Sequence, residues 1–255
     1  MNYKSIGQCI YCGSTSGLTN EHIIPYALQG NWVLKKASCK KCANITGKLE
    51  QSILRGPLLS VRAAANFKTR QPEDRPSSFP LEVKRGGKEE KINVPTKDLF
   101  TILVLPLMPQ AAYIDGWPYV SGIEVRGTET IAFGKNPTKL MNMLGADSIS
   151  ITKTYSFVDF IRMIGKIGYG LAVADFGLSA IAEPYILPAV MGQVDEIGKW
   201  VGSDDFVSEV EKRGALHACL TSIVKHKREK LIVVKVKLFA DAHPTGYHVI
   251  VGRAK

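Results

Sequence analysis

Four cysteines in two Cys-x2-Cys pairs are the residues of this chain whose types and spacing best fit metal chemistry. The pairs are Cys9/Cys12 and Cys39/Cys42, and 26 residues lie between them. Four thiolates arranged in this way can close one tetrahedral zinc site. The spacing therefore predicts a structural Zn²⁺ that folds a segment too short to bury a core of its own. A zinc ribbon or finger without catalysis is the alternative interpretation.

A histidine lies between the two pairs, in the run Glu21-His22-Ile23-Ile24-Pro25. A zinc site closed around this segment would hold His22 rigidly, and a general base must be held in this way. An imidazole with its ordinary pKa of about 6.5 is mostly neutral at pH 7 and can accept a proton. His22 is therefore the candidate catalytic base, and a purely structural histidine is the alternative.

Basic residues are concentrated in the N-terminal quarter of the chain. The formal net charge is +10, and residues 1–70 contain ten lysines and arginines against two acids, Glu21 and Glu50. Such an excess favours a polyanionic partner, most simply the phosphate backbone of a nucleic acid, although it also favours solubility. Five lysines are the candidate phosphate contacts, with a solvated face as the alternative: Lys35, Lys36, Lys40, Lys41 and Lys48.

Composition limits the class of protein. Hydrophobic residues make up 45% of the 255 residues, which is enough for a substantial core. No apolar run reaches the length of about 18 residues that a membrane-spanning helix needs. The first residues lack the apolar stretch of a signal peptide, and paired cysteines then fit metal binding better than disulfides. We therefore expect a cytoplasmic protein.

Periodicity and breaker residues predict the elements. Cys39 opens a helix that runs to about Arg55, and Gly56-Pro57 ends it. Residues 58–69 form a second helix, residues 70–79 a linker, and residues 156–175 the longest helix, whose glycines indicate close packing against another element. Strands are predicted at 80–85, 90–94, 100–105, 119–125, 129–133, 215–224, 231–239 and 246–252.

These elements predict an α+β protein. Residues 1–57 form the zinc module, residues 58–79 a helix and linker, and residues 80–255 a mixed α+β domain with a possible role in target recognition or regulation.

The order of Cys-x2-Cys, Glu21-His22-Ile23-Ile24-Pro25 and a second Cys-x2-Cys entering a helix resembles the HNH endonucleases, the ββα-metal or treble-clef nucleases. The resemblance covers about residues 9–50. It implies a β-hairpin and helix that hold a structural zinc, with His22 as the general base. It also implies that Glu21, in place of the usual Asp, binds a catalytic Mg²⁺ or Mn²⁺ ion.

One position departs from the family pattern. The residue after the last cysteine is often Asn or His in the family and binds the catalytic metal, but it is Ala43 here. Asn44 is the neighbouring replacement, rotated about 100° around the helix. Glu50 lies seven residues after Ala43 and projects from nearly the same face. Glu50 is slightly favoured over Asn44 as the second ligand, and a role as an ordinary helix-surface residue remains the alternative for each.

The sequence therefore predicts a metal-dependent endonuclease that cleaves double-stranded DNA, in a setting such as restriction or phage defence. A homodimer is one candidate assembly, because enzymes of this family that cut both strands often dimerise. The alternative is a catalytically degenerate treble-clef module that binds nucleic acid or a partner, and Ala43 is the residue that favours it.

Overall fold

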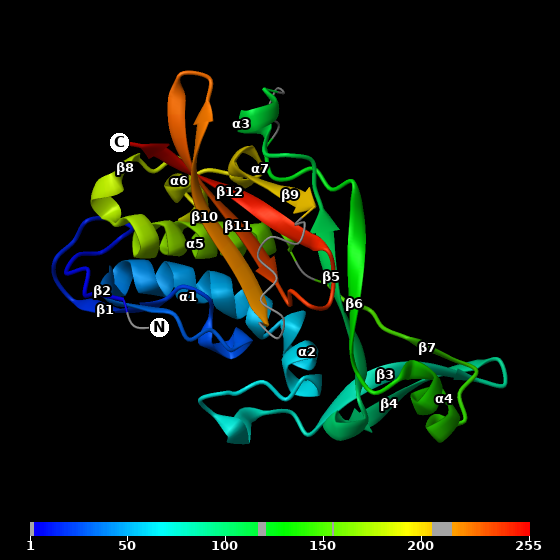
Figure 1. Cartoon of the computed structure of the whole chain (residues 1–255). Coiled ribbons are helices and arrows are strands. Elements are labelled where there is room, and N and C mark those ends of the chain that lie inside the picture. The colour runs from blue at the N-terminus through cyan, green and yellow to red at the C-terminus, as the bar shows by residue number, and fades with distance from the viewer. Residues whose placement is uncertain (1–2, 117–120, 155, 206–215) are drawn as a thin grey trace.

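The N-terminal segment folds as a β-hairpin followed by a helix. A computed structural model of the chain describes residues 3–116, 121–154, 156–205 and 216–255 (Figure 1). Strand β1 (Leu18–His22) pairs antiparallel with β2 (Val33–Cys39), and α1 (Lys40–Leu54) begins directly after β2. The mixed α+β class and the N-terminal ββα module are therefore confirmed.

The longest helix, α5 (Phe157–Phe176), lies between this module and a C-terminal sheet (Figure 1). It packs against α1 on one side and against the sheet on the other. The sheet is antiparallel, with strand order β10-β11-β12-β8, and β9 also pairs with β12. Its strands are β8 (Ile181–Glu183), β9 (Val201–Asp205), β10 (His217–His226), β11 (Glu229–Leu238) and β12 (Thr245–Ala254).

Glycines let α5 approach the sheet closely, as their spacing predicts. A Cβ atom on Gly168 would lie 2.7 Å from Cγ1 of Val249 on β12, which is closer than carbon atoms can approach. A Cβ atom on Gly165 would lie 2.9 Å from Cδ1 of Ile186. The absence of side chains at these positions is what allows the helix to lie this close to its neighbours.

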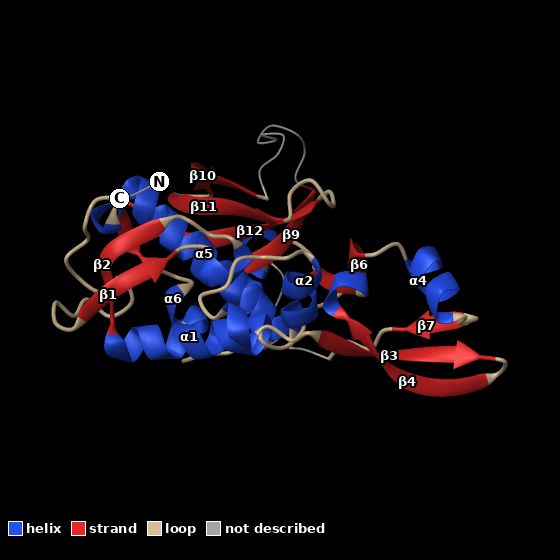
Figure 2. Ribbon diagram, turned by 90° about the horizontal axis from the view of Figure 1, so that it is seen from below, coloured by secondary structure: helices blue, strands red, loops and turns tan. Residues whose placement is uncertain are grey.

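A smaller lobe projects from one side of the molecule (Figure 2). Its sheet has the order β4-β3-β7 and carries helix α4 (Pro137–Leu144). The lobe has its own small apolar cluster, formed by Leu81, Val83, Val94 and Leu140. Its strands are β3 (Ser78–Arg85), β4 (Lys88–Pro95) and β7 (Ser148–Ser150).

The main apolar core includes residues of the zinc module, of α5 and of the C-terminal sheet, and extends in sequence from Cys9 to Ala254. The hairpin of β5 (Phe100–Leu107) and β6 (Gly127–Gly134), together with α2 (Leu58–Ala64), joins this core to the smaller lobe. The division at residues 57 and 79 stays a prediction. No helix among the described residues is long and apolar enough to cross a membrane.

Some predicted elements differ from the observed ones. Helix α2 ends at Ala64, five residues before the predicted end at 69. The strand predicted at 119–125 is wrong for residues 121–125, which lie in bends and irregular chain, and residues 119–120 lie outside the described part. Three one-turn helices carried no signal in the sequence: α3 (Ala112–Asp115), α6 (Leu187–Val190) and α7 (Ile197–Trp200).

Candidate active site

The four cysteines converge on one point, as the spacing predicts. Their Sγ atoms all lie within 4.8 Å of one another, and those of Cys12 and Cys39 are 3.7 Å apart. A tetrahedral zinc ion with Zn–S bonds of about 2.3 Å places its sulfur ligands about 3.8 Å apart. The cluster therefore fits a structural zinc. Within the described ranges it is the only group of three or more His, Cys, Asp or Glu residues close enough to share a metal ion.

Local backbone structure presents the thiols. Residues 9–13 form a tight turn in which the N–H of Gly13 donates to the carbonyl oxygen of Cys9 at 2.9 Å. Cys39 precedes the first turn of α1, and the backbone N–H of Cys42 lowers the pKa of its thiol to about 7. A thiol held in the field of a helix N-terminus is converted easily to the thiolate that zinc requires.

Glu21 and Glu50 come together against α5, although β1 and α1 carry them separately. Both carboxylates point at Lys166 of α5, whose Nζ lies 2.6 Å from Oε1 of Glu21 and 2.8 Å from Oε1 of Glu50. The Lys166 side chain is 1% exposed, against 7% for Glu21 and 20% for Glu50. Burial alone would lower the pKa of Lys166, but the two carboxylates raise it above its ordinary value.

This arrangement does not fit a divalent ion held between the two acids. A Mg²⁺ or Mn²⁺ ion would need the oxygen atoms that already bind the ammonium group. Asn44, the other candidate ligand, lies exposed on α1. The structure thus brings Glu50, and not Asn44, next to Glu21.

His22 is the last residue of β1 and is half-buried. Its ring meets that of Tyr26 edge-on, with 6.1 Å between the centroids. Burial lowers the pKa of His22 below its ordinary value, and the positive charges of Arg70 and Lys166 lower it further, against opposing effects of the two acids. The imidazole is therefore neutral at pH 7 and able to accept a proton.

His22 lines a cleft with a volume of about 540 Å³ between the module and the chain that follows it. Glu50 and Tyr26 line the same cleft. Four arginines also line it, and its only acids are Glu50 and Asp74, so the lining is net positive: Arg55, Arg62, Arg70 and Arg75.

The four arginines differ in how far they are engaged within the protein. Arg62 donates to the carbonyl oxygens of Ala27 at 3.0 Å and Leu54 at 2.9 Å. Arg75 donates to Asn66 and Phe67, so both of these guanidinium groups help to build the cleft wall.

The other two cleft arginines are exposed. Arg70 lies with its guanidinium 5.1 Å from the centre of the Tyr26 ring, and Arg55 follows the C-terminus of α1. Both are free to contact a phosphate group.

The five lysines named from the sequence are exposed on β2 and α1, and none of them lines this cleft. Their role as phosphate contacts stays a prediction.

Lys166 and the cleft arginines were not predicted from the sequence. In the sequence, Lys166 is a single charged residue within an otherwise apolar helix. A lysine at the centre of an otherwise apolar helical stripe is a signal that a buried acid must lie opposite, and this signal was available.

Comparisons with known proteins concern the zinc module alone. No curated protein and no solved structure matches the chain. A family model described as HNH endonuclease matches residues 9–55, which contain the four cysteines, both acids and His22. The resemblance to the HNH endonuclease family is thereby confirmed for the N-terminal module of this protein.

Proposed function

We propose that the chain is an endonuclease that hydrolyses phosphodiester bonds of DNA, with His22 as the general base. The observation that carries the proposal is the position of His22, which opens from the family-matched module into a cleft lined by four arginines. A phosphodiester carries negative charge that such a cleft attracts, and guanidinium groups suit its oxygens.

In the proposed reaction a ring nitrogen of His22 takes a proton from a water molecule in the cleft. The water oxygen then attacks phosphorus, the bond from phosphorus to the 3′ oxygen of the strand breaks, and the departing 3′ oxygen takes a proton from solvent water. This outcome leaves a 3′-hydroxyl and a 5′-phosphate, as the family resemblance implies. Arg55 and Arg70 would hold the non-bridging oxygens and stabilise the charge that develops on them.

The proposal keeps four finer expectations from the sequence. The catalytic cofactor would be Mg²⁺ or Mn²⁺, in addition to the zinc held by the cysteines, and it would bind Glu21 and Glu50 only after the ammonium group of Lys166 has left them. The substrate is double-stranded DNA, which Lys35, Lys36, Lys40, Lys41 and Lys48 contact outside the cleft. The protein acts in the cytoplasm, for example in restriction or phage defence. A homodimer is the candidate assembly for cutting both strands, since one module attacks one strand.

The first prediction is that His22→Ala lowers the rate of plasmid cleavage by about 10²- to 10⁴-fold, the usual contribution of a general base. Purified zinc-loaded protein is incubated with supercoiled plasmid in Mg²⁺, Mn²⁺ or EDTA, and the nicked and linear forms are quantified. His226→Ala, at the turn between β10 and β11, is the matched control and should cleave like the wild type. Equal rates for His22→Ala and the wild type would contradict the proposed role.

A degenerate module that binds nucleic acid is the second candidate function. The ion pairs of Glu21 and Glu50 with Lys166 favour this binding function, because both carboxylates already have a cationic partner within the protein. In that case the wild type and His22→Ala bind DNA equally, and neither cleaves it under any of the three conditions. Filter binding of the same plasmid, run beside the cleavage assay, separates the two functions.

A further inference from the structure

The ammonium group of Lys166 has the surroundings of a bound cation. Beside the two carboxylates, it donates to the carbonyl oxygen of His22 and lies 3.5 Å from that of Ile23. Four oxygen atoms from β1, the residue after it and α1 therefore surround one positive charge. Hard cations are bound in proteins by oxygen shells of this kind.

The position of this charge is the position that the sequence assigns to a metal. Glu21 and Glu50 are the acids that the family pattern and the helix geometry nominate as its ligands. Two carboxylates held side by side repel one another, and a cation that lies between them offsets this repulsion. Lys166 supplies that cation from a helix that begins more than a hundred residues after α1 ends.

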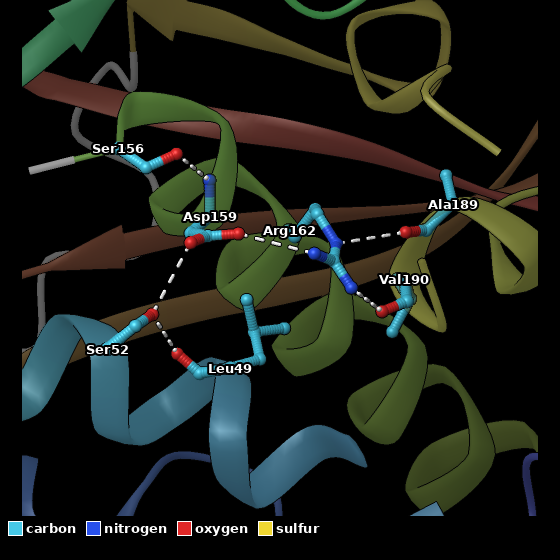
Figure 3. A network of polar contacts seen from close by, with 7 residues as sticks. All are labelled: Leu49, Ser52, Ser156, Asp159, Arg162, Ala189 and Val190. Carbon is cyan, nitrogen blue, oxygen red and sulfur yellow. Dashed lines mark hydrogen bonds and ion pairs between the residues drawn. The ribbon is translucent and has the colours of Figure 1, made fainter. Parts of the chain in front are cut away.

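A polar network fixes α5 against α1 ahead of Lys166 (Figure 3). Ser52 Oγ of α1 lies 3.5 Å from Oδ2 of Asp159, whose Oδ1 accepts a hydrogen bond from Arg162 at 3.2 Å. The Arg162 guanidinium also donates to two carbonyl oxygens of α6 at 3.1 Å each. Lys166 follows Asp159 by about two helical turns and lies on nearly the same face, so the network aims it at the acid pair.

A second contact fixes the helix beyond Lys166. The hydroxyl of Tyr169 donates to the carbonyl oxygen of Ile10 in the first cysteine turn at 2.5 Å. The Tyr169 ring also lies 6.0 Å from that of Tyr11. With anchors on both sides of it, Lys166 is held between the two acids by the packing of the whole helix.

We propose that Lys166 is a resident cation that excludes a divalent ion from Glu21 and Glu50, so that Mg²⁺ or Mn²⁺ binds this pair only when the ammonium group is displaced. The inference rests on the proposed function, because only a metal-dependent nuclease would need a catalytic ion at this pair of acids. The C-terminal part of the chain thereby controls the metal affinity of the module.

The test measures Mn²⁺ binding and not cleavage. Full-length zinc-loaded protein is titrated with Mn²⁺, and the free ion is followed by electron paramagnetic resonance. Lys166→Met keeps the unbranched apolar stem and removes the ammonium group. This variant should bind Mn²⁺ at least about tenfold more tightly than the wild type, within the usual range of coupling between two sites. Adding Glu50→Gln to this variant should abolish the gain.

Lys153→Met is the matched control. Lys153 is a half-buried lysine whose ammonium group donates to the carbonyl oxygen of Pro57 and to Ser60, and not to the acid pair. This variant should bind Mn²⁺ as the wild type does. An equal gain in Lys153→Met and Lys166→Met, or no gain in a folded Lys166→Met protein, overturns the proposal.

Two further measurements apply if Lys166→Met folds poorly, because removing one partner leaves buried charge unpaired. Its melting temperature should rise with added Mn²⁺, whereas that of the wild type should stay unchanged. In addition, the wild type and Glu50→Gln should give coinciding Mn²⁺ titrations, since the pair is already occupied. A wild type that binds Mn²⁺ through Glu50 overturns the proposal without any variant of Lys166.

The outcomes separate this inference from the nuclease proposal. Tighter Mn²⁺ binding by Lys166→Met without cleavage by any variant supports the resident cation and overturns the endonuclease. Cleavage that depends on His22, together with unchanged Mn²⁺ binding in Lys166→Met, supports the endonuclease and overturns the resident cation.

Discussion

At the scale of single residues, His217 of β10 contacts the zinc module through one ring nitrogen and the residue after β11 through the other. Nε2 lies 2.6 Å from the carbonyl oxygen of Leu28, and Nδ1 accepts the backbone N–H of Phe239 at 3.2 Å. This pair of contacts requires a neutral ring with its proton on Nε2. Burial lowers the pKa of His217, which agrees with the neutral form.

The second prediction is that His217 makes the protein less stable in mild acid. Because its pKa is lower in the folded than in the unfolded protein, the unfolded chain binds the proton more readily as pH falls below about 6.5. The free energy of unfolding should therefore drop between pH 7.5 and pH 5.5. Denaturant titrations should show a smaller drop in His217→Gln, and an identical pH dependence in both proteins would contradict this account.

The residues of the site were predictable to different degrees. The zinc ligands were predictable because each Cys-x2-Cys pair is local in the sequence: Cys9, Cys12, Cys39 and Cys42. Helix periodicity favoured Glu50 over Asn44 as a metal ligand; the structure places Glu50 and Glu21 on the same ammonium group, and the role of Glu50 as a ligand stays a prediction. Lys166 and the cleft arginines were not predicted, because they approach His22 through the packing of separate elements, and a sequence carries no direct record of that packing.

At the scale of elements, the packing of α5 depends on its glycines as well as on its apolar face. Gly168 faces Val249 of the sheet with no room for a methyl group. In contrast, Gly47 of α1 has no atom within 4 Å of the position that a Cβ would take. Two helical glycines thus have opposite structural roles.

The third prediction uses these two glycines as a matched pair. Gly168→Ala should lower the free energy of unfolding by about 1–3 kcal/mol, the usual cost of an overpacked core. Gly47→Ala should raise it by up to about 1 kcal/mol, because alanine favours the helix and meets no neighbour. Chemical denaturation of both variants measures the difference, and a neutral or stabilising Gly168→Ala would show that α5 does not approach the sheet this closely.

The fourth prediction concerns the zinc ion that the cysteine cluster fits. Structural zinc contributes about 10–16 kcal/mol of binding free energy in small zinc-finger peptides, more than most domains have in total stability. Chelation should therefore unfold β1, β2 and α1. Hydrogen exchange should show loss of protection in residues 9–55 first, and Cys12→Ser should reproduce the effect without chelator. Protection that persists in zinc-free protein would mean that α5 alone maintains the module.

Long periodic elements were predicted well, and short ones were not. The 156–175 and 39–55 helices and the C-terminal strands are set by runs of apolar residues, which the sequence displays directly. Strands β8 and β9 and the one-turn helices exist because the main core holds them in place, so their residues carry little periodicity of their own.

At the scale of the whole molecule, the positive charge divides between two regions. The exposed lysines on β2 and α1 lie outside the cleft, and the arginines line it beside His22. A nucleic acid drawn by the general charge of the molecule would be gripped closely only where the arginines meet its phosphates.

The fifth prediction separates these two regions. For duplex DNA, each lost phosphate contact reduces the salt dependence of binding, log K against log salt, by about 0.9. The double variant Arg55→Ala/Arg70→Ala loses two proposed phosphate contacts, so the magnitude of its slope should fall by nearly twice this amount. The double variant Lys40→Ala/Lys41→Ala should show a smaller fall. Fluorescence anisotropy over a range of salt concentrations measures both slopes, and the reverse order would place DNA over the outer face of α1.

The long separation between Lys166 and the acids it neutralises also bears on biosynthesis. The zinc module leaves the ribosome before α5 does, but the charge that offsets those of Glu21 and Glu50 lies 144 residues after His22, whose carbonyl group it also binds. A nascent module can bind zinc, yet it must keep both acids hydrated until α5 has been synthesised and has docked. Completion of the N-terminal site is therefore a late event in folding, and a ribosome that stops before α5 releases a module with its two acids still in water.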